Sequence, residues 1–550
     1  MNFLENIFER LAQSAQRPVL QEVDNGRIVS ATGRQLLSAI AQAQAFLRRA
    51  GIGRGDRCVL LAPNSIRWAA LDLAAMAAGA IVVPLYARQS PAELVYMIKD
   101  CAPSLVCCGS VALRDSITNH GDLAPPMFLL EEIFEDQGQR SIENATPGPL
   151  SDRDPVTIIY TSGTSGEPKG VVLHVGNVNH MLGCTTGRLN ALMGDRSQPE
   201  RVFHYLPFCF AGSWILLLSC LSRTSVLTLS TDLTKLAKEI HLAAPDYFLN
   251  VPALLERVRG GIENQLTQRG GLALRLFRNA QDAWLSRQDG VTTLSGSLWL
   301  ALARTLLFPA IRKRISSHLK ALICGSAPLA KETQLFFMMM GVPVLQVYGL
   351  TETTAICTMD HPQHIEPGFV GGAIDDVEMR LGPGEEILVR GPNVFPGYWN
   401  RPQATAEVMR EGWFHTGDLG EVNSRDRWRV TGRMKNLIIP SSGHNVAPEP
   451  LEESLLRALP GAQQVVLCGN GRSFLTAIVT GSVSREKVEA TLETFNAPLP
   501  HYKRIRGFYL HPEPFSVENG LLTANGKLRR EAIAERLQEQ IEEMYRTLQS

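Results

Sequence analysis

One loop of the chain reads Tyr160-Thr161-Ser162-Gly163-Thr164-Ser165-Gly166-Glu167-Pro168-Lys169-Gly170. Hydroxyl groups, glycines and one lysine follow one another with almost no bulk, so backbone N–H groups and an ammonium can approach a polyphosphate without a Cβ clash. An apolar, strand-like segment lies on each side, at 156–160 and 170–173. We interpret the loop as one that binds nucleotide phosphates; a solvent-exposed Gly/Ser loop is the alternative.

The order of elements around this loop differs from that of a Walker phosphate site. A Walker loop joins a strand to a helix and reads G-x-x-x-x-G-K-[ST]. Here the loop joins two predicted strands, and its glycines and Lys169 do not reproduce that spacing. The sequence therefore predicts a phosphate-binding loop of a different lineage.

Predicted helices and strands alternate over the first 150 residues. The helices are predicted at 35–50, 68–78 and 91–99, and the strands at 57–62, 79–85 and 105–108. The alternation resumes after the loop, with strands predicted at 225–229, 247–251, 321–324 and 344–348. This pattern is typical of doubly wound α/β architecture.

The pattern changes towards the C-terminus. Short strands, glycines and prolines over 368–419 predict a small β-rich subdomain. After it, strands at 462–469, 475–479 and 507–510 and helices at 450–459, 484–495 and 529–546 predict a compact α/β unit. We therefore expect a large N-terminal domain, residues 1–432, made of doubly wound α/β subdomains and the β-rich subdomain, and a small C-terminal α/β domain, residues 433–550.

Composition excludes several classes of protein. Lysine plus arginine equals aspartate plus glutamate at 54 each, so no global field attracts nucleic acid, and we expect no nucleic-acid partner. The ten cysteines contain no C-x-x-C pair, which favours buried free thiols in a reducing cytoplasm over a metal site. Residues 1–17 predict an amphipathic helix rather than a signal peptide. We expect a cytoplasmic protein.

A helical, partly basic insertion is predicted at 254–320. Its segment 298–308 is strongly apolar and runs into Arg312-Lys313-Arg314. An apolar stretch beside a basic cluster suits anionic lipid headgroups, so peripheral membrane contact through 298–314 is one interpretation. A core helix with a solvated end is the other. No run of 18 apolar residues occurs, so no membrane-spanning helix is expected.

Further short segments carry candidate chemistry. At the end of a predicted strand, Tyr348-Gly349-Leu350-Thr351-Glu352 offers an aromatic face for a base, a hydroxyl and a carboxylate suited to Mg²⁺. Asp418, after a tight glycine turn, can accept hydrogen bonds from ribose hydroxyls. Further on come Gly432-Arg433-Met434-Lys435-Asn436, Ser441-Ser442-Gly443-His444-Asn445-Val446 and a turn that carries Lys527.

In this order, these segments resemble the adenylate-forming superfamily of acyl-CoA synthetases, luciferases and peptide-synthetase adenylation domains. The resemblance covers residues 57–530 and includes Gly325-Ser326-Ala327, which matches the family's adenine-side turn. The helical insertion and the segment Trp413-Phe414-His415-Thr416-Gly417-Asp418 are most similar to long-chain fatty acyl-CoA synthetases.

The resemblance implies a two-step reaction. A carboxylate attacks the α-phosphate of ATP, pyrophosphate leaves, and a thiol, that of CoA, then displaces AMP from the acyl-adenylate. Because an anion approaches a polyanion, Mg²⁺ and lysines are needed to lower the barrier. The implied catalytic residues are Lys527, Thr351 and Glu352, with Glu352 as the Mg²⁺ ligand. The implied ATP- and AMP-binding residues are Thr161, Ser162, Gly163, Thr164, Ser165, Gly166, Lys169, Gly325, Ser326, Ala327, Tyr348, Gly349, Asp418 and Arg433.

The resemblance also implies a mobile C-terminal domain. In the family this domain rotates between the two steps about a hinge, which Lys435 matches here. Lys527 is then withdrawn, and the loop with Ser442, Gly443 and His444 forms the thiol channel. Asn436 stands where relatives usually have an acid, which leaves the salt bridging of the hinge open.

The acyl pocket departs from the common pattern. Phe210 stands where many relatives have histidine, and Trp214 matches a tryptophan that gates the fatty-acid tunnel in some long-chain members. A core tryptophan is the competing interpretation of Trp214. The apolar surroundings favour a medium- or long-chain fatty acid over an amino acid. An acyl-carrier protein as the thiol partner, release of the acyl-adenylate to a partner, and a catalytically silent binding protein remain the alternatives to a CoA ligase.

Overall fold

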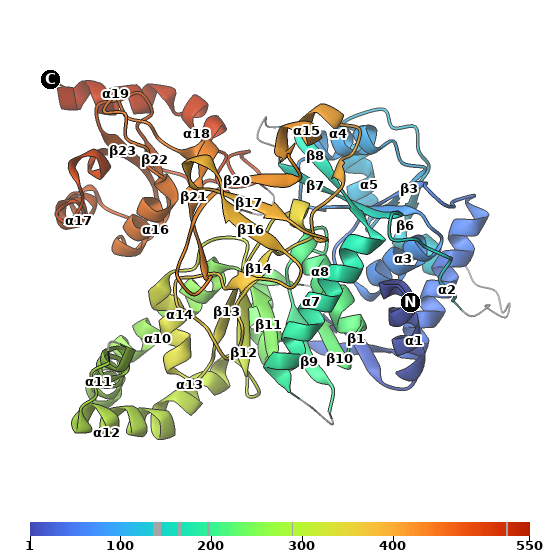
Figure 1. Ribbon diagram of the computed structural model, residues 1–550, viewed down its shortest axis with the longest axis horizontal. Coiled ribbons are helices and arrows are strands. Elements are labelled where there is room, and N and C mark those ends of the chain that lie inside the picture. Colours follow the sequence, from blue (N-terminus) through green and yellow to red (C-terminus); the bar gives the residue numbers. More distant parts are fainter. Residues whose placement is uncertain are drawn as a thin grey trace.

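The computed structural model describes residues 1–549 except 136–144, 163–166, 195–197, 231, 289 and 524–525. Its first sheet has seven strands in the order β18-β8-β7-β4-β3-β5-β6 (Figure 1). The strands are β3 (Arg57–Leu61), β4 (Ile81–Leu85), β5 (Leu105–Cys108), β6 (Met127–Leu129), β7 (Pro155–Ser162), β8 (Pro168–His174) and β18 (Gly397–Tyr398). β7 and β8 pair antiparallel, so the strand–loop–strand prediction is confirmed.

The second sheet has nine strands in the order β15-β14-β13-β12-β11-β9-β10-β1-β2, and the strands from β1 to β13 in this order are parallel. The strands are β1 (Pro18–Asp24), β2 (Arg27–Thr32), β9 (Glu200–His204), β10 (Ser225–Leu229), β11 (Tyr247–Asn250), β12 (Ala321–Cys324), β13 (Val344–Tyr348), β14 (Thr358–Met359) and β15 (Gly372–Ala373). Of these, β1, β2, β9 and β14 were not predicted.

Helices cover the two sheets and join them in one large core. That core combines side chains from both sheets with buried side chains of α1, α2, α3, α7 and α8. The helices of this region are α1 (Phe3–Gln13), α2 (Gly33–Arg49), α3 (Ile66–Ala77), α4 (Pro91–Cys101), α5 (Val111–Thr118), α6 (Leu130–Glu135), α7 (Val175–Met193), α8 (Ala211–Leu221), α9 (Leu236–Ala243) and α14 (Lys331–Met339). The predicted doubly wound α/β architecture is confirmed.

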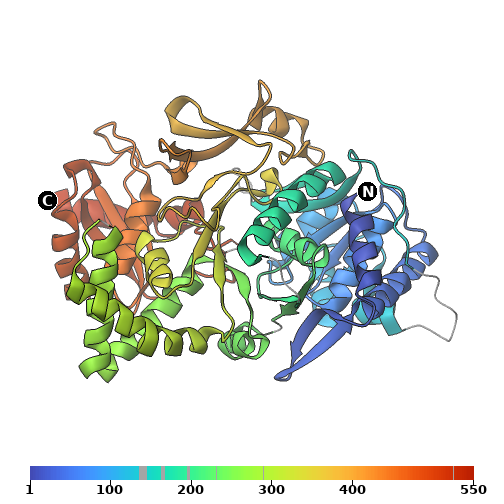
Figure 2. The same ribbon diagram turned by 60° about the horizontal axis from the view of Figure 1, so that its bottom comes forward.

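The β-rich subdomain and the C-terminal unit also form. β16 (Glu378–Leu381), β17 (Glu386–Arg390), β19 (Met409–Arg410), β20 (Trp413–Val422) and β21 (Trp428–Arg433) make one sheet, beside α15 (Pro402–Val408). β22 (Ala462–Cys468), β23 (Leu475–Gly481) and β24 (Ile505–His511) make another, covered by α16 (Pro448–Ala458), α17 (Arg485–Asn496), α18 (Arg530–Arg536) and α19 (Gln538–Gln549) (Figure 2). The single helix predicted at 529–546 is thus two helices, interrupted at Leu537.

The predicted helical insertion is α10 (Pro252–Arg269), α11 (Gly271–Gln288), α12 (Leu294–Leu302), a π-type turn (Ala303–Leu307) and α13 (Phe308–Ile315). Gly270 and Gly271 have φ of +56° and +59°, a backbone that favours glycine and that ends α10. By length and composition the continuous helix Leu294–Ile315 is long and apolar enough to cross a membrane, which corrects the expectation of no such segment. Because only 22% of its most apolar 18-residue stretch is buried, this helix is not an ordinary core helix.

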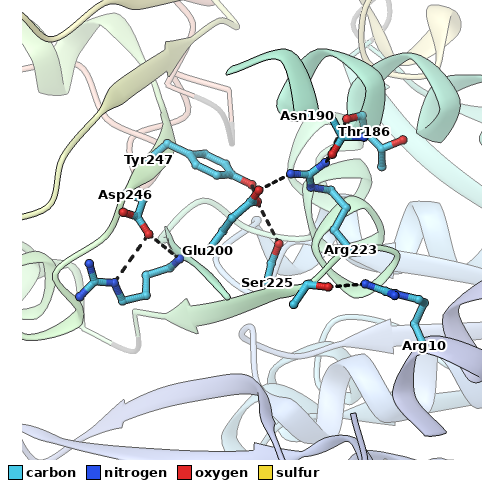
Figure 3. A network of polar contacts seen from close by, with 10 residues as sticks. Arg10, Thr186, Asn190, Glu200, Arg223, Ser225, Asp246 and Tyr247 are labelled. Carbon is cyan, nitrogen blue, oxygen red and sulfur yellow. Dashed lines mark hydrogen bonds and ion pairs between the residues drawn. The ribbon is translucent and has the colours of Figure 1, made fainter. Parts of the chain in front are cut away.

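A buried ion pair links three strands of the second sheet. Glu200 on β9 pairs with Arg223, and it accepts hydrogen bonds from Ser225 Oγ of β10 (3.2 Å) and from Tyr247 OH of β11 (3.3 Å) (Figure 3). Arg223 also donates to the backbone oxygen of Thr186 on α7 (3.0 Å). Because both charges are buried, each depends on the other for compensation.

Replacing Glu200 with alanine is therefore expected to destabilise the fold by about 3–5 kcal/mol, since Arg223 is left as an uncompensated buried charge. Urea unfolding, followed by tryptophan fluorescence, measures the loss. The matched control is Glu421→Ala, which removes a half-exposed partner of Arg429 and is expected to change stability by about 0–1 kcal/mol. Equal losses for the two variants would contradict the importance assigned to the buried pair.

Candidate functional site

The site begins where β13 ends. Tyr348 is the last residue of this strand, and the short 3₁₀ turn Thr351–Thr353 follows at once. A Cβ on Gly349 would lie 2.4 Å from both the carbonyl oxygen of Ala355 and the Cα of Ile356, so only glycine fits this bend. The bend directs Thr351 and Glu352 into a cavity of about 2890 Å³ that the N-terminal sheets and the C-terminal unit line together.

Glu352 carries a buried carboxylate. Its Oε1 accepts a hydrogen bond from Tyr398 OH (2.8 Å), and burial raises the pKa of Glu352. The Lys169 ammonium lies 5.5 Å from the centre of the Tyr398 ring, within the range of a cation–π contact. Tyr398 thus connects the phosphate loop to Glu352, a role that sequence reasoning did not assign. Its place on β18, paired with β8, is what brings it there.

Asp418, Arg433 and Tyr348 form a second polar group. Asp418 is 3% exposed; its Oδ1 lies 2.6 Å from Arg433 Nε, and its Oδ2 accepts from Tyr348 OH (2.9 Å). The contact follows from strand register, because Asp418 on β20 faces Arg433 on β21. Burial, and then the charge of Asp418, raise the pKa of Tyr348 well above its usual value. The phenol therefore stays neutral, and its O–H can donate the hydrogen bond to Asp418.

Glu386 holds the segment that carries Asp418. This carboxylate, at the start of β17, lies 2.8 Å from His415 Nδ1 through Oε2 and accepts from the backbone N–H of Gly417 (3.0 Å) through Oε1. Thr416 Oγ1 accepts from the backbone N–H of Asp418 (3.0 Å). Sequence reasoning did not identify Glu386, since its partners lie about thirty residues away along the chain.

Lys527 reaches this cavity from the C-terminal unit. Its backbone N–H donates to Thr523 Oγ1 (3.0 Å), which fixes the turn, and its neighbour Arg529 forms an ion pair with Glu93 of α4. Lys527 lines the cavity and is exposed to the solvent within it. Desolvation, and then the charge of Arg433, lower the pKa of Lys527 to about 8, although Asp418 and Glu352 oppose the shift.

Lys435 lies on the short turn that follows β21, between the β-rich subdomain and the C-terminal unit. Desolvation, and then the charge of Arg433, lower its pKa. Asn436, next to it, donates from Nδ2 to Glu449 Oε1 of α16. This hydrogen bond ties the connection between the two units to the first helix of the C-terminal unit.

The structure brings most of the predicted site residues together. The cavity is lined by Thr161, Lys169, Phe210, Gly325, Ser326, Ala327, Tyr348, Gly349, Thr351, Glu352, Asp418, Arg433, Lys435 and Lys527. The predicted residues Gly163, Thr164, Ser165 and Gly166 lie outside the described residues, as does the side chain of Ser162.

Two predicted groups lie elsewhere. Trp214 is fully buried in the core, where its indole N–H donates to Asp72 Oδ2 (3.0 Å), and it is not among the described residues that line the cavity. This favours a core tryptophan over a tunnel gate. Ser442, Gly443 and His444 are exposed, and the His444 ring stacks on Tyr502 with 4.1 Å between centroids. In the arrangement described, Lys527 lines the cavity and this loop does not.

An apolar wall adjoins the polar cluster. Phe210 lies at the N-terminus of α8, with its ring 5.8 Å from that of Tyr86, and Leu249 and Val251 also line the cavity. Phe210 therefore stands at the cavity wall, as predicted for an acyl pocket residue.

Comparison with known protein families shows which family the chain belongs to. A model described as "AMP-binding enzyme" matches residues 7–399, and one described as "AMP-binding enzyme C-terminal domain" matches residues 435–549. The chain belongs to the AMP-binding enzyme family. The gap between the two matched ranges contains β20, β21 and the domain boundary predicted between residues 432 and 433. Neither match tests the position of that boundary, which stays a prediction.

Relatives of this AMP-binding enzyme span nearly its whole length. It is 27% identical to the long-chain-fatty-acid–CoA ligase FadD15 of Mycobacterium bovis, over 99% of this chain and 97% of the relative. It is 28% identical to a chloroplastic long-chain-fatty-acid–[acyl-carrier-protein] ligase of Arabidopsis thaliana, AEE15, over 94% and 82%. Among solved structures, the A domain of a carboxylic acid reductase from Segniliparus rugosus shares the fold, with a TM-score of 0.77 at 21% identity, over 100% of this chain and 94% of that one.

The geometry around Asp418 leads to a binding prediction. Asp418→Asn is expected to weaken AMP binding by about 10- to 100-fold, because the amide loses the charge-assisted hydrogen bonds that a carboxylate accepts and releases Arg433. Isothermal titration with AMP measures the change. Glu421→Gln, an exposed acid on the same strand, is the control and is expected to leave AMP affinity unchanged. If Asp418→Asn binds AMP as tightly as the wild type, Asp418 does not contribute to nucleotide binding.

Proposed function

We propose that this protein is an AMP-forming acid–thiol ligase that activates a medium- or long-chain fatty acid with ATP, releases pyrophosphate, and transfers the acyl group to CoA. One observation carries the proposal: Lys527 of the C-terminal unit shares a cavity with Glu352, Asp418 and Arg433. A nucleotide-binding protein without catalysis has no need for an ammonium that a second unit places in the cavity. The relatives named as fatty-acid ligases support the same reaction.

Each residue has a distinct part in the first step. Tyr348 provides a flat face for adenine, and Asp418 accepts hydrogen bonds from the ribose hydroxyls while Arg433 holds its carboxylate in place. Thr161 and Lys169 bind the outer phosphates, and Thr351 binds the α-phosphate. The Lys527 ammonium lies between the attacking carboxylate and the α-phosphate, where it reduces their repulsion as the new bond forms.

The site fits a magnesium ion bound largely through the nucleotide. Mg²⁺ on phosphates takes only one or two protein carboxylates, and Glu352 supplies one, held by Tyr398. The ion, when bound, neutralises charge on the phosphates of ATP. Burial has already removed most of the water from Glu352, so the carboxylate is poised for a cation.

The acyl group is proposed to lie along the apolar wall. Phe210, Leu249 and Val251 offer a surface that an alkyl chain can cover, and Phe210 replaces the polar contact that a histidine would make. A fatty acid gains by leaving water for such a wall, while a charged amino acid does not.

For the second step we propose that the C-terminal domain rotates about Lys435. Lys527 would leave the cavity and the loop with Ser442, Gly443 and His444 would enter it to guide the thiol. The exposure of this loop in the present arrangement is compatible with that motion.

The thiol acceptor has a second candidate. The likeness to an acyl-carrier-protein ligase, AEE15, favours a carrier protein as the alternative to CoA. All ten cysteines are free, which suits a reducing compartment, and we propose the cytoplasm.

The proposal is tested by pyrophosphate release across a panel of carboxylates from acetate to palmitate, with CoA, with an acyl-carrier protein, and with neither. We expect release to rise with chain length, because each added methylene buries more apolar surface against the wall. Thioester formation with CoA supports the ligase, and thioester formation only with the carrier protein supports the alternative. Absence of release with every carboxylate would overturn both.

The position of Lys527 predicts a pH dependence of the first step. The ammonium form is needed and its pKa in the free enzyme is about 8, so kcat/KM for pyrophosphate release should fall by about tenfold for each pH unit above that value. In Lys527→Arg the charge persists, so the fall should move to higher pH even if the rate is lower. Lys487→Arg, on the surface of the same unit, is the control. An unshifted profile in Lys527→Arg would assign the titration to another group.

A further inference from the structure

The most exposed apolar surface of the described residues lies on the helix Leu294–Ile315. Four leucines at intervals of four face solvent: Leu294 is 93% exposed, Leu298 62%, Leu302 37% and Leu306 69%. The π-type turn between α12 and α13 carries a backbone hydrogen bond from Phe308 to Ala303, five residues apart, which lets this stripe continue on one side of the helix. We name these four residues the leucine stripe.

The opposite face of the same helix is packed. Leu300, Ala303, Phe308 and Ile311 are buried in a core cluster with residues of α10, α11 and α14. The helix is therefore fixed to the body along one side and open along the other. Figures 1 and 2 show the α11–α12 hairpin at the edge of the molecule, away from the N-terminal sheets. An apolar stripe on a projecting, fixed hairpin marks an interaction surface.

The charges around the leucine stripe indicate its partner. Residues 271–315 contain seven basic residues and two acidic ones, Asp282 and Asp289. Among described residues, none of the seven forms an ion pair with an acid; they are Arg275, Arg278, Arg287, Arg304, Arg312, Lys313 and Arg314. A surface that combines exposed leucines with unneutralised basic side chains is complementary to an anionic lipid bilayer.

We propose that the hairpin docks on an anionic lipid surface, with the leucine stripe in the headgroup region and the basic side chains against the phosphates. The helix lies on the surface and does not cross it. Its buried face stays committed to the protein core, and Arg304 sits exposed in its middle, where a spanning helix would carry a charge into the hydrocarbon.

The docking surface is close to the cavity of the proposed site. Leu285 and Gln288, near the end of α11, line that cavity together with Leu233 and Phe210. The hairpin thus joins the lipid-facing stripe to a cavity wall. If the proposed function holds, docking would bring the acyl wall near the bilayer, where fatty acids partition; the docking itself does not depend on that reaction.

Vesicle flotation of the full-length protein tests the proposal. The vesicles are phosphatidylcholine alone, or equal parts of phosphatidylcholine and phosphatidylglycerol, at low and at high salt. We expect binding to the mixed vesicles at low salt, weaker binding at high salt, and little binding to phosphatidylcholine. Leu298→Gln/Leu306→Gln should weaken binding by about tenfold or more, since two apolar side chains no longer enter the headgroup region. Arg304→Gln/Lys313→Gln should remove the preference for the anionic vesicles.

Val29→Gln/Val422→Gln is the matched control, because both valines are exposed and lie on other elements. It should bind like the wild type, and all variants should keep the wild-type circular dichroism and melting temperature, since every replaced residue is exposed. Failure of the wild type to float with either vesicle, or wild-type binding by Leu298→Gln/Leu306→Gln, would overturn the proposal. A further contrary result would be a wild type that binds no lipid but self-associates, with the self-association abolished in Leu298→Gln/Leu306→Gln. The leucine stripe would then be the contact surface for a second copy of the chain.

Discussion

The ion pair between Asp418 and Arg433 is the contact on which the site depends. Asp418 is almost fully buried, so its charge requires a partner, and the register of β20 and β21 provides one at 2.6 Å. Tyr348 reaches the same carboxylate from β13 and so joins the β-rich subdomain to the nine-stranded sheet. Arg433 is also the last residue before the turn that leads to the C-terminal unit. Both partners of the pair therefore lie on strands of the β-rich subdomain, before the turn begins.

Much of the fold could be predicted because its strands are short, apolar and separated by helices. β12 and β13 have the predicted bounds, since each is a buried run that needs no distant partner to be recognised. The hairpin of β1 and β2 was missed although its turn has a local signal. Asn25 and Gly26 have φ of +47° and +76°, the left-handed backbone of a tight hairpin turn that an Asn-Gly pair favours.

The parts of the site that escaped prediction are those made by distant contacts. Tyr398 and Glu352 are 46 residues apart, and nothing near Tyr398 marks it as a partner of a buried carboxylate. Trp214 is the opposite case, because it was predicted to line the acyl pocket and lies in the core. Its helix is apolar on all sides, so local sequence cannot separate a pocket residue from a core residue, and the deciding contact is Asp72, 142 residues away. That carboxyl is fully buried, and burial raises its pKa to about 7.

The surroundings of Lys527 could not be predicted from nearby residues either. A lysine on a turn is ordinarily solvated, and only the docking of the C-terminal unit brings other charged groups close to this one. Contacts such as the Arg529–Glu93 ion pair hold the C-terminal unit against the N-terminal domain, where desolvation and the charge of Arg433 lower the pKa of Lys527. Arg433 and Lys435 face the same cavity, so docking gathers cations that repel one another. A bound polyphosphate offsets this repulsion, and by linkage the same anion stabilises the docked arrangement and returns the proton affinity of Lys527 towards its usual value.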